Sequence, residues 1–303
     1  MLLVLLVLAS PLGAQQKASP PTPDALAQSV EQWMRENLDD DVLEALAEID
    51  QQRVRQFFAE LQRRFAGTSV YDLASLKDTA GSLLPVLDQF EETRPYAVWL
   101  KAHLDFFDAA EELRRERKPP SQTPDLSVPP IELERKVWSR QLLKRPPPRL
   151  AQVYIPRLKQ IFTQEGVPPE LAWVAEVESS FDPQARSPAG AAGLFQLMPT
   201  TAHTLQLAAW PRDERLEPDK NARAAARYLR SLYRHYGNWP LALAAYNAGP
   251  SRVDQLLKKE RVRTYEGIAS RLPAETQMYV PKVEATLRKR EAIALSTLKL
   301  PAG

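Results

Sequence analysis

The side chain best suited to chemistry in this chain is a glutamate in a predicted helix. The segment Pro169 to Ser179 has helical spacing at i, i+3, i+4 and i+7, where it carries Leu171, Val174, Ala175 and Glu178. Glu178 therefore lies on the apolar face, at the C-terminal end of the helix. Burial and the negative end of the helix dipole both disfavour a charged carboxylate there, so its pKa should be raised. Such an acid stays protonated near neutral pH and can act as a general acid.

Two other carboxyl groups lie near Glu178 in the sequence. Glu176 is on the opposite side of the helix, so it should point toward solvent or another element. Asp182 is four residues on and is a candidate second carboxylate, but Pro183 follows it, which favours a role in a turn. On helical pattern alone, a Glu178 that is ion-paired to an arginine, or that is simply a tolerated polar residue, remains the simpler interpretation.

The segment after Glu178 has the composition of a loop that lines a groove. Gly190 and Gly193 permit close backbone approach. Ser187 and Gln196 are neutral hydrogen-bonding groups suited to sugar hydroxyls and amides. Met198 offers a soft apolar surface for a sugar face or an acetamido methyl group.

Three sequence blocks together resemble a known family. The first runs from Glu178-Ser179 through Gly193-Leu194-Phe195-Gln196 to Pro199. The second is Ala245-Tyr246-Asn247-Ala248-Gly249-Pro250, and the third is Glu275-Thr276 followed by Tyr279-Val280. In this order they are similar to the signatures of the lytic transglycosylases of the soluble, SLT-domain type, including the membrane-bound D-like branch. The resemblance covers roughly residues 150–290.

The resemblance implies an enzyme that cleaves the glycan strands of bacterial peptidoglycan. Glu178 would be the sole general acid and base. It would protonate the oxygen of the β-1,4 bond between N-acetylmuramic acid and N-acetylglucosamine, and then take the proton of the muramyl C6 hydroxyl, which attacks C1. The product would carry a 1,6-anhydro ring and no water would be consumed. The implied partner is the glycan strand.

The same resemblance assigns further residues to substrate binding. Ser187, Gln196 and Met198 should line the groove beside Glu178. Tyr246 should place its hydroxyl near the reacting sugar, although a core aromatic that hydrogen-bonds locally fits the pattern too. Asn247 should support the same loop, and Glu275 should either bond the substrate or hold the floor of the site.

The elements that position these residues are predicted to be helices throughout, with no sustained strand pattern. The fold class is therefore all-α, and the resemblance implies that the second half is a lysozyme-like catalytic domain, preceded by a helical N-terminal region. In the first half, helical patterns fit residues 24–34, 42–65, 73–90 and 96–117. In the second half, they fit residues 151–164, 169–179, 200–207, 220–236, 240–248, 250–259 and 273–290.

Proline marks the predicted division of the chain. Residues 118–148 hold eight of the 27 prolines, with a short helix predicted from Ile131 to Leu143. This stretch is interpreted as a semi-rigid connector or, equally, as an irregular wrap packed on the second domain. It separates the helical region 24–117 from the SLT-type domain at 149–295, which a tail follows at 296–303.

Composition limits the function classes. With 40 Lys and Arg against 38 Asp and Glu, the net charge of +2 argues against a nucleic-acid partner. Three histidines and no cysteine exclude a thiolate nucleophile and a zinc site of the cysteine type. We therefore predict no metal and no cofactor.

The N-terminus has features of an export signal. Residues 2–9 form an apolar run too short to span a bilayer, and a small residue precedes a plausible cleavage after Ala14. We predict a signal peptide at 1–14, a flexible lead at 15–23 and a soluble periplasmic protein. No cysteine follows the run, so a lipid anchor on cysteine is not expected.

Two other classes of function remain open at this stage. One is a lysozyme-like hydrolase, which needs a second carboxylate or a bound water opposite Glu178. The other is a glycan-binding module of the cell envelope without catalysis. The helical region 24–117 is also a candidate docking site for an envelope protein.

Overall fold

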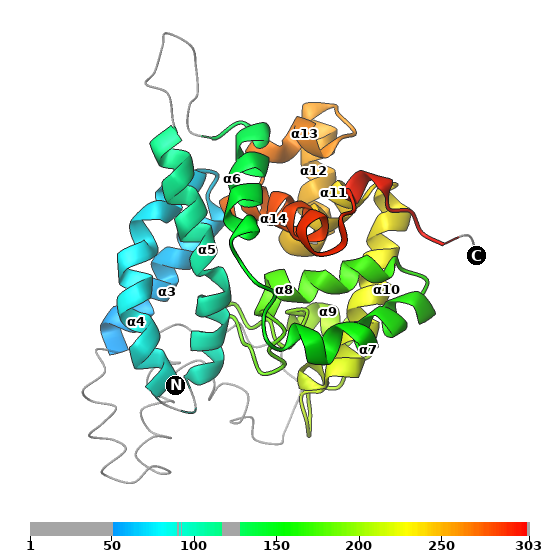
Figure 1. Ribbon diagram of the computed structural model, residues 1–303, viewed down its shortest axis with the longest axis horizontal. Coiled ribbons are helices and arrows are strands. Elements are labelled where there is room, and N and C mark those ends of the chain that lie inside the picture. The colour runs from blue at the N-terminus through cyan, green and yellow to red at the C-terminus, as the bar shows by residue number, and fades with distance from the viewer. Residues whose placement is uncertain (1–50, 90, 92, 117–127, 302–303) are drawn as a thin grey trace, which may run out of the picture.

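The computed structural model describes residues 51–89, 91, 93–116 and 128–301, and over these residues the protein is helical (Figure 1). The only β-type pairings there are isolated bridges in the loop 186–197. The predicted all-α class is thus confirmed. The predicted signal peptide, the lead, the first helix and residues 118–127 lie outside the described residues. No helix in the described ranges is long and apolar enough to cross a membrane.

The N-terminal region is a helical unit with its own apolar core. Phe57, Phe58, Leu61 and Phe65 recur at helical spacing and are buried, as the periodicity predicts. The helix ends before Gly67, whose N–H bonds the carbonyl of Arg63. The elements of this unit are α3 (Gln51–Ala66), the 3-10 helix η2 (Val70–Leu76), α4 (Lys77–Gln89) and α5 (Arg94–Glu116).

Helix α6 (Ile131–Leu143) has the predicted bounds and lies between the two halves of the chain (Figure 1). Val137 and Trp138 are fully buried in the same core as α3 and α5. The described part of the proline-rich stretch is therefore packed into the fold and is not a free linker.

The second half contains shorter helices joined by tight turns. Helix α10 ends at Gly237, which has a φ of 73°, and Asn238 then caps α11 by accepting the Leu241 N–H. The helix predicted at 169–179 begins instead as a 3-10 turn, a common start for an α-helix. The elements are α7 (Ala151–Gln164), η3 (Pro169–Trp173), α8 (Val174–Ser179), α9 (Pro199–Thr204), η4 (Glu214–Leu216), α10 (Pro218–Tyr236), α11 (Trp239–Ala248), α12 (Pro250–Glu260), α13 (Tyr265–Ile268), η5 (Ala269–Arg271), α14 (Ala274–Glu291) and η6 (Leu295–Thr297).

Helix α14 connects the two cores. Ala274, Met278 and Ala285 pack into the core of the N-terminal unit, while Val280 and Val283 pack into that of the second half. Figure 1 shows α14 lying between α6 and α11. A helix buried on most of its circumference holds its side chains rigidly, and α14 holds Glu275 and Tyr279 in this way.

Candidate active site

Glu178 is placed by the abrupt end of α8. Ser180 and Phe181 both adopt positive φ angles, of 52° and 64°, and the Phe181 N–H bonds the carbonyl of Ala175. Phe181 is fully buried, so core packing compensates for this unfavourable backbone. The turn leaves Glu178 in the last helical turn with 8% of its surface exposed.

The loop that follows is held in one conformation by buried polar groups. Gly193 has a φ of 84°, and a Cβ there would lie 1.9 Å from the carbonyl oxygen of Arg215, so only glycine fits. The Arg215 guanidinium donates to the carbonyls of Gly190 and Leu197. The Asn221 carboxamide accepts the N–H of Phe195. The loop is therefore a rigid wall beside Glu178.

Within the described residues, the Glu178 carboxyl has one hydrogen-bond partner, the hydroxyl of Tyr279. The Tyr279 Oη donates to Glu178 Oε1 at 2.6 Å. The pKa of Glu178 is raised to about 8, chiefly by burial and also by the nearby Glu275 carboxyl, against the opposing effects of the Tyr279 hydrogen bond and the Lys282 charge. Glu178 is thus a protonated acid at neutral pH, as the helical pattern predicts, and not the partner of an arginine.

A second carboxyl group, that of Glu275, belongs to a chain of polar side chains. Asn247 Nδ2 donates to Glu275 Oε1 at 3.3 Å, and Thr276 Oγ1 donates to Asn247 Oδ1 at 2.6 Å. Burial raises the pKa of Glu275 as well, against the effect of the Asn247 bond. This chain fixes the first turn of α14 to the end of α11.

One cavity of about 530 Å³ is lined by every residue that the sequence assigns to the site. Its lining includes Glu178, Ser187, Gln196, Met198, Tyr246, Asn247 and Glu275. Among the described residues, no group of three His, Asp or Glu side chains is arranged to hold a metal ion. The cavity offers carboxyl, amide and hydroxyl groups beside apolar ones, which suits a neutral polar ligand.

The neutral side chains in the cavity differ in how far they are already bonded. Ser187 Oγ accepts the Ala191 N–H at 2.9 Å, and the Tyr246 hydroxyl donates to the Phe195 carbonyl at 2.6 Å. Gln196 donates through Nε2 to two backbone carbonyls, but its Oε1 has no partner in the described part of the chain. Met198 is 40% exposed, unusual for a large apolar side chain.

Part of the chain is similar to known proteins. Residues 159–267 match the family model described as Transglycosylase SLT domain. This part of the chain is similar to the SLT domain. The match ends before α14, so Glu275 and Tyr279 lie outside it.

Two relatives are similar over a comparable length of this chain. Membrane-bound lytic murein transglycosylase D of Escherichia coli is 36% identical over 126 residues, which are 40% of this chain and 28% of that protein. Soluble lytic murein transglycosylase of Salmonella typhimurium is 38% identical over 120 residues, 37% of this chain and 19% of that protein. The chain thus matches less than a third of the length of either relative.

A solved structure is similar over a larger share of the chain. The 70 kDa soluble lytic transglycosylase from Escherichia coli is 21% identical, with a TM-score of 0.38. The similar region makes up 86% of this chain and 48% of that protein's chain.

The other two carboxylates near Glu178 have the positions that the sequence indicates. Glu176 lies on the opposite side of α8 and forms a two-pronged ion pair with Arg290, at 2.7 and 2.9 Å. Asp182 Oδ1 accepts the N–H of Gln184 at 2.8 Å, which is a turn, and it does not line the cavity. Neither residue competes with Glu178 for the role of acid.

Sequence reasoning missed part of the site. Tyr279 belongs to the third sequence block, but the resemblance assigns no role to it. Arg252 adds an exposed guanidinium at the cavity. The N-terminal unit also contributes cavity residues, for which no local sequence pattern gives a signal.

The Tyr279 hydrogen bond makes a testable contribution to the pKa of Glu178. We expect Tyr279→Phe to move this pKa above about 8, because the lost bond favoured the ionised carboxylate. The measurement is an NMR titration of the carboxyl carbon of Glu178. Tyr246→Phe is the matched control, since its hydroxyl donates to Phe195 instead. A Glu178 pKa that stays constant or falls in Tyr279→Phe contradicts the assignment.

Proposed function

We propose that this chain is a peptidoglycan lytic transglycosylase of the periplasm, with Glu178 as its sole general acid and base. One observation carries the proposal: a buried, protonated carboxyl that opens onto a cavity and is held by the Tyr279 hydroxyl. The SLT domain and relatives named lytic murein transglycosylases support the substrate class. The substrate is the glycan strand.

The reaction begins with protonation of the leaving group. Glu178 donates its proton to the oxygen of the β-1,4 bond between N-acetylmuramic acid and N-acetylglucosamine, and the bond from C1 to this oxygen breaks. The 2-acetamido carbonyl of the substrate stabilises the developing positive charge at C1. Tyr279 donates to the carboxylate that this step creates, so the charge is not left unpaired.

The second step returns the proton to Glu178. The muramyl C6 hydroxyl attacks C1 and forms the 1,6-anhydro ring, while the Glu178 carboxylate takes the hydroxyl proton. Atoms balance without water, and the enzyme ends in its starting protonation state. A pKa near 8 suits both steps, because an acid and its conjugate base with this pKa exchange protons readily near neutral pH.

A hydrolase on the same scaffold would use a second carboxylate as base or nucleophile. Asp182 does not line the cavity, so the candidate would be Glu275. Asn247 Nδ2 already donates to Oε1 of Glu275 and ties this carboxyl to the end of α11, which favours a structural role for Glu275 over that of a base. A module that only binds glycan would have no need of a carboxyl with a pKa near 8, which costs folding free energy when it ionises.

Mass spectrometry of muropeptides released from purified sacculi tests the proposal. We expect products one water lighter than muropeptides with reducing ends, from the wild type and also from Glu275→Gln, at reduced rate. Reducing ends from the wild type would show a hydrolase, and their loss in Glu275→Gln would identify the second carboxylate. Binding to sacculi without release would show a glycan-binding module.

A further inference from the structure

The cavity at Glu178 has a wall that does not belong to the SLT domain. Helix α3 contributes Leu61, Gln62, Phe65 and Ala66, and α5 contributes Trp99 and His103. These residues are more than 70 positions away from Glu178 in the sequence. We name them the N-terminal wall.

Hydrogen bonds to backbone carbonyls tie the N-terminal wall to the elements that carry the site. The Ala274 N–H, at the start of α14, bonds the Gly67 carbonyl at 2.6 Å. The side chain of Gln277 donates to the Thr68 carbonyl at 2.9 Å. The Arg186 N–H, one residue before Ser187, bonds the Pro95 carbonyl at 3.1 Å. The wall is therefore attached on both sides of the cavity.

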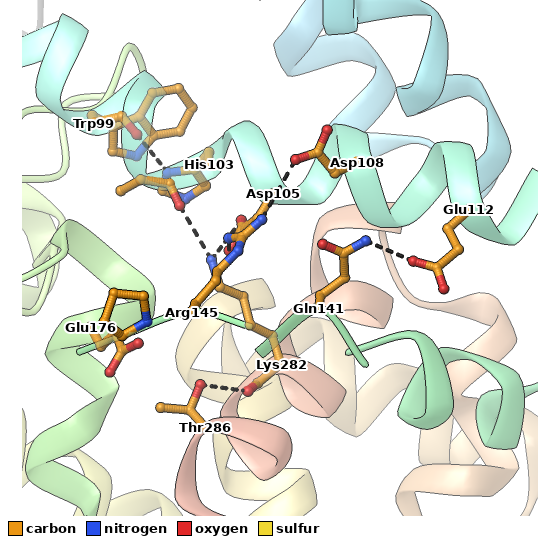
Figure 2. Close-up of polar contacts among 12 residues, drawn as sticks. Trp99, His103, Asp105, Asp108, Glu112, Gln141, Arg145, Glu176, Lys282 and Thr286 are labelled. Carbon is orange, nitrogen blue, oxygen red and sulfur yellow. Dashed lines mark hydrogen bonds and ion pairs between the residues drawn. The ribbon is translucent and has the colours of Figure 1, made fainter. Parts of the chain in front are cut away.

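A buried charge cluster fixes the wall further (Figure 2). Lys282 of α14 donates to Asp105 of α5 at 2.9 Å, and both side chains are less than 10% exposed. Arg145 donates to the other Asp105 oxygen at 2.7 Å. Moving α5 away from α14 would leave these charges without partners in a buried site, which is energetically costly. The N-terminal wall is thus a fixed part of the cavity.

The base of the wall is a packed aromatic cluster. Trp99 and His103 stack with their ring centres 4.2 Å apart, and Phe65 lies 6.4 Å from each. Burial lowers the pKa of His103 to about 4, so the ring is neutral at neutral pH. This apolar base brings no charge to the cavity.

Gln62 and Ala66 also line the cavity. They lie one turn apart on α3, and both are exposed. Gln62 makes no hydrogen bond to the described part of the chain. A free carboxamide offers two donors and an acceptor, which match sugar hydroxyls and acetamido groups. Ala66 leaves room beside it. An apolar surface with one free amide is typical of a site for a neutral polar ligand.

We infer that the N-terminal wall forms one side of the glycan-binding cleft, with Gln62 as a substrate-binding residue. The inference rests on the proposed function for the identity of the ligand. It assigns helices α3 and α5 to glycan binding. This face of the N-terminal unit then belongs to the active site and is not a docking surface for a separate envelope protein. The contacts are with the sugar backbone of the strand.

The experiment uses the full chain with two wall substitutions. Gln62→Ala removes the free amide and Ala66→Trp fills the space beside it. Gln56→Ala and Ala59→Trp are matched controls, since Gln56 and Ala59 are exposed residues of α3 that do not line the cavity. Chitohexaose, a β-1,4-linked oligomer of N-acetylglucosamine, is titrated calorimetrically into each protein with Glu178→Gln as the common background. Cleavage of soluble glycan strands is measured with Glu178 intact.

We expect Gln62→Ala to raise the Kd for chitohexaose and the KM for strands roughly threefold to tenfold, the effect of one neutral hydrogen bond. Ala66→Trp should raise both by about tenfold or more through steric exclusion, with kcat changed less. Both controls should match the parent.

Wall variants that bind and cleave like their controls would overturn the inference, as would the absence of chitohexaose binding by the parent. If the wild type fails to cleave but the wall variants still weaken chitohexaose binding, the proposed function is wrong and the wall assignment stands.

Discussion

Glu178→Gln should abolish glycan cleavage while leaving the fold and the cavity intact. The amide is nearly the same size as the acid and its oxygen can still accept the Tyr279 hydroxyl. It has no acidic proton to donate and cannot take one from the C6 hydroxyl. General acid and base catalysis by a positioned group contributes about 10²–10⁴-fold, so we expect a loss of that size or larger in kcat. Release of muropeptides from sacculi measures it.

The same substitution should also change the pH dependence of stability. This second effect comes from the burial of Glu178 and is measured without any cleavage assay. The pKa of Glu178 is about 8 in the folded protein against 4.5 as the ordinary value. The folded state therefore holds this proton more tightly than the unfolded chain, and stability falls as the pH rises from 4.5 to about 8. Glu178→Gln removes this penalty, so it should be more stable than the wild type at pH 8, by a few kcal/mol in order of magnitude.

Urea unfolding at acidic and alkaline pH measures this difference. Glu170→Gln is the control for cleavage, because Glu170 lies on η3 outside the cavity and its substitution should leave the cleavage rate unchanged. Two results would contradict the assignment of Glu178. One is cleavage by Glu178→Gln at the wild-type rate. The other is a variant whose stability relative to the wild type does not increase with pH.

The second large effect is expected at the charge cluster between α5 and α14 (Figure 2). Lys282 Nζ contacts Asp105 and lies 4.6 Å from the centre of the Phe106 ring, in a site that excludes water. Burial lowers the pKa of Lys282, against the effect of Asp105. Asp105→Asn removes the negative charge that compensates both Lys282 and Arg145. Removing one partner of a buried pair costs about 3–5 kcal/mol, and we expect a loss of that size in the free energy of unfolding.

Urea unfolding of Asp105→Asn and of two further variants tests this interpretation. Asp108→Asn is the matched control: Asp108 also contacts Arg145 and lies on α5, but its side chain is 36% exposed, so its loss should cost less than about 1 kcal/mol. Lys282→Met combined with Asp105→Asn should recover much of the stability lost in Asp105→Asn alone, because no Lys282 charge is left unpaired. Equal losses in Asp105→Asn and Asp108→Asn would contradict a buried pair.

The sequence was informative wherever short-range periodicity decides structure. The stripe of Phe57, Leu61 and Phe65 predicted the buried face of α3, and the bounds of α6 and α7 were predicted as observed. The same 3.6-residue spacing placed Glu178 on a buried face and Glu176 on the other. Helical spacing is a local property, so these residues needed no knowledge of their neighbours in space.

The sequence motifs named the residues of the site, but only the tertiary structure decided what each contacts. No spacing rule relates Glu178 to Tyr279, which lie 101 positions apart, or Asn247 to Glu275. The position of Gln62 at the cavity could likewise not be predicted from the sequence, because it depends on the tertiary packing of α3 against α14. Local patterns determine which face of a helix is buried. What that face is buried against depends on the tertiary packing of the whole chain. Here it is set by α14, which packs against both cores.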